Sequence, residues 1–176
     1  MLDFDDLVRR EADGSVLLGV DRTFARRFYT NVSLNEIEAR TGQTPYFEKA
    51  VIYTALVGAP VLLLLSVIRS PWVIGWWSAL SIPVAVLIWI GFYGDSARAG
   101  ARLRVISVVV VGVGIGTLVT DGQTRAVWFL GFVYASALWL TRLLYISATS
   151  FLRALVLQNR RAWEWLHEQF VLRDAR

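Results

Sequence analysis

The sequence predicts an all-α integral membrane protein with a four-helix transmembrane bundle made of two antiparallel hairpins. Two observations predict this class. Of the 176 residues, 56% are hydrophobic and only 18% are charged, against about 25% charged residues in an average soluble domain. The apolar residues are concentrated in four long blocks, and the charged residues lie before, between and after them. A soluble domain would instead spread its apolar residues at the helix or strand period.

Residues 1–49 are expected to form a cytoplasmic helical segment. The acidic start of the chain and the lack of an apolar block before position 50 argue against a signal peptide. Ser33 and Glu36 fit a capping box that opens a short helix ending near Gly42. A basic and aromatic cluster, which is typical of segments that lie on anionic lipid headgroups, contains Arg22, Arg26 and Arg27.

The transmembrane domain is expected over residues 50–147. A helix rises about 1.5 Å per residue, so roughly 20 residues cross about 30 Å of hydrocarbon. The very short connection after the first span and the short one after the third make each pair of spans a helical hairpin, and two hairpins give an up-down-up-down bundle. The four predicted spans are residues 50–68, 72–93, 103–120 and 126–147.

Basic residues predict the orientation of these spans. The connections after the first and third spans each carry one basic residue, Arg69 and Arg125, whereas the connection after the second carries three. The positive-inside rule therefore places both chain ends in the cytoplasm. Of the 18 basic residues, all except Lys49 are arginine, which we take as the mark of a GC-rich bacterial genome. We expect a multi-pass protein of the bacterial inner membrane.

Small residues in the third span predict close helix packing. Gly112 and Gly116 are four residues apart, and Thr120 extends the row by one turn. Such rows let two helix backbones approach closely in lipid. The contact lies either within one chain or between subunits of a homo-oligomer.

Two prolines, Pro60 and Pro83, fall in the middle of the first and second spans. A proline removes a backbone hydrogen bond and kinks a helix. The kinks serve either as hinges beside a cavity or simply as packing geometry.

The fourth span carries the polar residues of greatest interest. Arg142 is the ionisable residue within it, and a charge at mid-bilayer costs about 2.5–3.5 kcal/mol on an insertion scale. It is either an interfacial anchor or a charge that lines a pore or binds a partner. Tyr134, Thr141 and Tyr145 supply further polar groups on the same helix.

The composition argues against an enzyme. No cysteine is present, and the single histidine, His167, lies outside the spans. The spans offer neither the carboxylates of a proton-coupled transporter nor a base for a buried serine. We expect no catalytic residue, cofactor or metal site, and no nucleic acid as partner.

Residues 148–176 are expected to form an amphipathic cytoplasmic helix whose apolar face includes Trp163. The helix either continues the fourth span or lies flat with Trp163 among lipid headgroups. Its apolar face is too broad to remain in water, so we expect it to pack on residues 1–49 or on another subunit.

Two functions fit these features. The first is a small oligomeric channel with cytoplasmic regulatory ends, in which the fourth span lines a pore formed by a ring of subunits. The second is a non-catalytic membrane anchor or accessory subunit that docks a partner protein through its cytoplasmic ends. The polar row on the fourth span favours the channel, because an anchor has no use for it.

Overall fold

A computed structural model describes residues 4–93 and 102–174. The chain is mostly helical and divides into two compact units. We call the first the terminal unit, because it consists of the residues up to Ile52 and those from Tyr145 onward. We call the second, Tyr53–Leu144, the apolar unit.

The N-terminal part of the terminal unit contains three short helices and one strand. Asp21 and Ser33 cap the second and third helices, since their side chains accept hydrogen bonds from the backbone N–H of Phe24 at 2.8 Å and of Glu36 at 3.1 Å. The third helix ends on Gly42, whose φ of 72° suits glycine. The helix predicted to start at Ser33 is therefore confirmed. The elements are α1 (Phe4–Ala12), β1 (Val16–Val20), α2 (Arg22–Asn31) and α3 (Leu34–Thr41).

The C-terminal part differs from the single amphipathic helix that the sequence predicts. Asn159 interrupts the helix, and its side chain caps the next helix by accepting from the backbone N–H of Arg161 and Ala162 at 3.0 and 3.2 Å. A strand follows and pairs with β1 in antiparallel fashion, with Val16 opposite Asp174 and Val20 opposite Phe170. The elements after Gln158 are α8 (Arg160–Leu166), η3 (His167–Gln169) and β2 (Phe170–Asp174).

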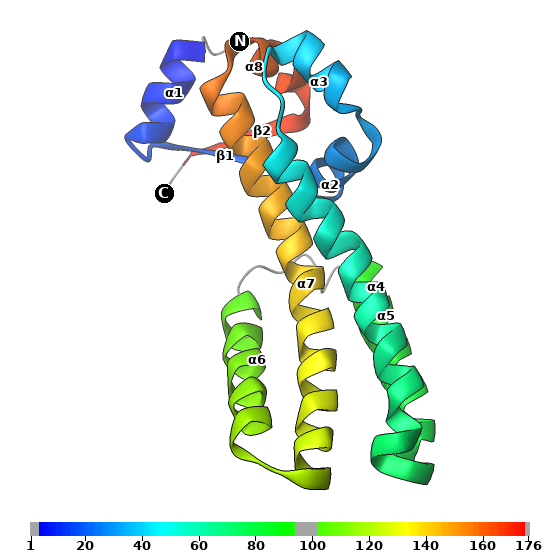
Figure 1. Cartoon of the computed structure of the whole chain (residues 1–176). Helices are drawn as coiled ribbons and strands as arrows, with labels where there is room; N and C mark the ends of the chain where they lie inside the picture. Colours follow the sequence, from blue (N-terminus) through cyan, green and yellow to red (C-terminus); the bar gives the residue numbers. More distant parts are fainter. Residues whose placement is uncertain (1–3, 94–101, 175–176) are drawn as a thin grey trace. The chain divides into compact units, whose positions relative to one another are not determined.

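Helices and strands from both ends of the chain lie together in the terminal unit (Figure 1). The expected packing of the tail on residues 1–49 is therefore observed within one chain. Apolar burial of this kind is the main force that holds such a unit together. Its buried side chains include Leu7, Leu18, Tyr29, Ile37, Leu152, Val156, Trp163 and Phe170.

The first helix of the membrane-like sequence is longer than predicted. Helix α4 (Tyr46–Ile74) runs through the expected turn at residues 69–71 and includes Pro71. That proline leaves the carbonyl of Val67 without its usual helical donor, and the Ser70 hydroxyl donates to this carbonyl at 2.9 Å. The chain turns at Gly75, where φ is +57°.

A short 3₁₀ helix, η1 (Gly75–Leu80), leads into helix α5 (Ser81–Tyr93). The second span is therefore not a single helix from residue 72. Pro83 is the third residue of α5, a position in the first turn where no helical hydrogen bond is lost. The structure thus places Pro83 in the first turn of a helix, and not in the middle of a helix as the sequence predicts.

The second hairpin joins helix α6 (Arg102–Val119) to helix α7 (Gly122–Gln158). Arg125 closes the connection by donating to the Thr120 carbonyl at 2.7 Å and by pairing with Asp121 at 2.9 Å. Helix α7 is 37 residues long and is continuous from the predicted fourth span into the tail. Helices α4 and α7 are therefore the two segments of chain that pass from one unit to the other.

Candidate functional site

The polar side chains of α7 are engaged inside the chain. In the apolar unit, the Tyr134 hydroxyl donates to the Ser81 carbonyl at 3.3 Å, and Thr141 donates to the Leu138 carbonyl at 2.6 Å. Arg142 is only 5% exposed, and Thr141 is fully buried. Thr141 and Arg142 therefore lie among the chain's own side chains, whereas Tyr134 is only half-buried.

Tyr145 belongs to the terminal unit and is almost fully buried there. Its hydroxyl accepts a hydrogen bond from the Arg26 guanidinium at 3.2 Å, and the same guanidinium lies 5.6 Å from the centre of the Tyr145 ring. Arg26 therefore joins α2 to α7, a structural role in addition to the membrane-surface role that the sequence suggests.

The glycines of α6 pack unequally. An added Cβ on Gly116 would meet the Trp128 ring at 2.6 Å, whereas one on Gly112 would meet nothing within 4 Å. The Thr120 hydroxyl donates to the Gly116 carbonyl at 2.6 Å. Gly116 thus packs against the Trp128 ring of α7 within the same chain, whereas Gly112 faces open space.

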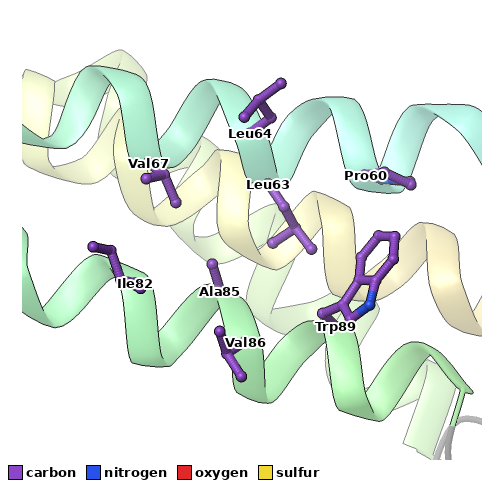
Figure 2. A pocket seen from close by; sticks show the side chains of 8 residues that line it. All are labelled: Pro60, Leu63, Leu64, Val67, Ile82, Ala85, Val86 and Trp89. Carbon is purple, nitrogen blue, oxygen red and sulfur yellow. The ribbon is translucent and has the colours of Figure 1, made fainter.

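Pro60 borders an apolar cavity of about 300 Å³ between α4 and α5. In Figure 2, Leu63 points from α4 toward Ala85 and Trp89 of α5. None of the lining side chains is ionisable. The cavity suits hydrocarbon and offers no group for catalysis.

The residues that the sequence predicts at the membrane surface differ in their exposure. Trp163 is 6% exposed and lies beside the rings of His167 and Phe170, with ring centres 5.9 and 6.4 Å away. The prediction that Trp163 contacts the membrane surface is therefore wrong, because the indole belongs to the core of the terminal unit. Arg27 is exposed, and Arg22 is partly exposed.

A polar groove of about 470 Å³ lies in the terminal unit, where α2, the connection from α3 to α4 and the last turns of α7 meet. Phe151 forms part of an apolar wall, and the polar side chains of the groove are Tyr29, Gln43, Thr44, Glu48 and Gln158. It is the candidate functional site of the chain, because it gathers polar side chains from three distant segments around an opening.

Tyr29 is the unusual member of this groove. The residue is fully buried, and its hydroxyl has no hydrogen-bond partner in the described part of the chain. A buried hydroxyl without a partner costs about 1–3 kcal/mol. Burial raises the pKa of Tyr29, and the negative charge of Glu48 raises it further. The phenol therefore remains neutral beside the carboxylate.

Sequence reasoning missed this groove. The sequence pattern places Tyr29 in the basic and aromatic cluster with Arg22, Arg26 and Arg27, and it assigns no role to Glu48. The groove-lining residues come from positions 29, 42–48 and 151–158, and no local pattern brings these three segments together. The only local sequence feature that marks the groove is the pair of polar residues Gln43 and Thr44 before Pro45.

Over residues 4–93 and 102–174, no group of three or more His, Asp or Glu side chains could hold a metal ion. No protein-family model, curated protein or solved structure matches this chain. The function must therefore be argued from the geometry alone.

Proposed function

We propose that the chain is a non-catalytic membrane anchor whose two ends form one cytoplasmic docking unit for a partner protein. The observation that carries this proposal is the terminal unit itself. Both ends of the chain build it, and its two continuations, α4 and α7, are the helices that supply the apolar segments.

The apolar segments support the membrane location. The segment Tyr46–Ile90 and the helix Gly122–Gln158 are long and apolar enough to cross a membrane, and only 28% of the most apolar window of each is buried. A core helix of a soluble protein would be mostly buried. Lipid is the solvent that suits such exposed apolar surface. A shorter apolar helix, Leu103–Val119, accompanies them.

The basic residues support an inner-membrane orientation with both ends in the cytoplasm. Helices α1 and α2 of the terminal unit each carry more than one basic residue. The connections at Arg69 and Arg125 each carry one. By the positive-inside rule, the terminal unit faces the cytoplasm.

The geometry favours the anchor over the channel. The polar row of α7 is the sequence feature that favours a channel, but Tyr134 and Thr141 donate hydrogen bonds to carbonyl groups within the chain. Arg142 is buried inside one chain, whereas a side chain that lines a pore between subunits must face the symmetry axis. The row therefore has a structural role in a membrane anchor.

The oligomeric channel is the second candidate, and Gly112 is the observation that favours it. The open space around Gly112 gives α6 a small-residue face on which a second copy could pack closely. In a ring of subunits, such a contact would bring equivalent helices around a common axis.

Conductance and mass distinguish the two candidates. Purified full-length protein is reconstituted in planar bilayers, with a known pore-forming protein as a positive control, and its mass is measured in native detergent complexes. The anchor predicts no current, whether the chain is monomeric or not. An anion-selective current that Arg142→Ala changes would overturn the anchor and support the channel.

A further inference from the structure

The groove at Tyr29 has the chemistry of a cation site. Glu48 is the one lining side chain that is charged at neutral pH. Within the described residues, no side chain forms a hydrogen bond or ion pair with its carboxylate. The only positive side chain next to it in sequence, Lys49, is directed elsewhere, since its ammonium donates to the Val32 carbonyl at 2.6 Å. Among the described residues, the groove therefore carries one negative charge, that of Glu48, without an ion-pair partner.

The neutral lining groups suit a ligand that donates several hydrogen bonds. The Tyr29 hydroxyl and the side-chain amides of Gln43 and Gln158 all carry acceptor oxygens. A primary ammonium group has three donors and no acceptor. Glu48 would supply the charge, and the Tyr29 hydroxyl, fully buried and without a partner in the described chain, would gain one.

The aromatic surroundings favour the same ligand. Phe151 lines the groove and lies 6.4 Å, centre to centre, from the ring of Phe47. Aromatic faces attract ammonium groups. The walls thus combine a carboxylate, neutral acceptors and an aromatic ring.

We propose that this groove binds a primary ammonium group, with Glu48 as its counter-ion and Tyr29 and the two glutamines as hydrogen-bond partners. An ammonium of this kind is carried either by an ethanolamine lipid headgroup or by a free amine. The lipid source fits the place of the groove along the chain, because α4 begins beside it with the exposed Tyr46 and Phe47, 64% and 71% exposed. Aromatic side chains gather at membrane interfaces.

The lipid source rests on the proposed membrane anchor, whereas the ammonium chemistry does not. In either case the inferred site differs from the proposed docking of a partner protein, because the terminal unit would itself bind a small ligand.

The test is lipid retention by the purified full-length protein in native mass spectra. Detergent complexes are mixed with dioleoyl phosphatidylethanolamine or with dioleoyl phosphatidylcholine. These lipids carry the same net charge, and the choline headgroup has no N–H donor. We expect the ethanolamine lipid to be retained on the order of ten-fold more, as the loss of charge-assisted hydrogen bonds implies. Equal retention of the two lipids, with no binding of a free amine, would overturn the site.

Matched variants assign the binding to the groove. Glu48→Gln should remove the preference for the ethanolamine lipid, and Tyr29→Phe should weaken it several-fold. Glu38→Gln makes the same chemical change at an exposed position of α3 outside the groove, and it should leave the preference unchanged. A preference that survives both Glu48→Gln and Tyr29→Phe would contradict the assignment.

The source of the ammonium is tested with glycerophosphoethanolamine, which carries the same headgroup without acyl chains. If the lipid is the ligand, this soluble compound should compete only at much higher concentration. If it binds as tightly as the lipid, the site is confirmed as an ammonium site for a free amine. Alkaline carbonate extraction of membranes tests the anchor separately: extraction of the chain would overturn the anchor, whereas retention without a headgroup preference would overturn only the groove.

Discussion

The Arg26 guanidinium donates a hydrogen bond to the Tyr145 hydroxyl at 3.2 Å, although the two residues are 119 positions apart in the chain. The contact joins an N-terminal helix to the helix that carries the last predicted span. It lies in a unit whose core also contains Tyr29, a second fully buried tyrosine. The two tyrosines differ in one respect, since Tyr29 has no hydrogen-bond partner among the described residues.

This difference predicts opposite effects of the same substitution. Tyr145→Phe removes a hydrogen bond to a charged group and should lower the free energy of unfolding by about 1.5–3 kcal/mol. Tyr29→Phe removes an unsatisfied hydroxyl and should leave that free energy unchanged or raise it. Thermal unfolding in a detergent without added lipid measures both. Equal destabilisation by the two variants would contradict the hydrogen-bond assignment.

The raised pKa of Tyr29 predicts a dependence on alkaline pH. The unfolded chain ionises this phenol near its usual pKa of 10, whereas burial, with the charge of Glu48, keeps it neutral in the folded chain. The unfolded state therefore releases the proton first, and stability falls as pH rises above 10, by about 1.4 kcal/mol per pH unit from this group. Chemical unfolding at pH 9 and pH 11 should show a smaller loss for Tyr29→Phe than for the unsubstituted chain. Identical losses would show that Tyr29 ionises in both states alike.

The two glycines of α6 should respond differently to alanine. Gly116→Ala places a methyl group against the Trp128 ring, and overpacking of this kind costs about 1–3 kcal/mol. Gly112→Ala meets open space within one chain and should be neutral or slightly stabilising. Thermal stability measures the first effect, and native mass shows whether Gly112→Ala disturbs an assembly. If Gly112→Ala were the more destabilising, the main contact of this row would lie between subunits.

Trp163 should behave as a core residue. Trp163→Ala removes a buried indole from the terminal unit and should lower the free energy of unfolding by about 3–5 kcal/mol. Trp72→Ala is the control, since Trp72 is 73% exposed in the apolar unit. Limited proteolysis should cleave the Trp163→Ala chain faster in the terminal unit, whereas Trp72→Ala should not change that rate. If Trp163→Ala were as resistant to proteolysis as the unsubstituted chain, the assignment of Trp163 to the core would be wrong.

Local chemistry made much of the helical structure predictable. The cap at Ser33, the short connection after the third span and the long apolar blocks depend on residues close in sequence, and the helical class follows from them. The connection itself is shorter than predicted, because α7 begins at Gly122 and not at residue 126. The turn at Gly75 was missed because Pro71 suggested an earlier stop, and Ser70 compensates for that proline. The pairing of β1 with β2 and the Tyr29 groove both depend on contacts between the two chain ends, which no window along the sequence reveals.

The pairing of β1 with β2 joins the two chain ends in a single unit. An engineered disulfide between the two strands tests this pairing most directly. The chain has no cysteine, and Leu18 lies opposite Leu172 in the sheet, where directly opposed Cβ atoms are about 4.5–5.5 Å apart. Membranes that contain Leu18→Cys with Leu172→Cys are oxidised, and the products are separated without reductant and mapped by mass spectrometry. Leu18→Cys with Val171→Cys is the control, because neighbouring strand residues point to opposite faces. We expect a disulfide within one chain for the first pair and little for the second. Absence of the disulfide in the first pair, or its formation only between two chains, would contradict a docking unit built from both ends of one chain.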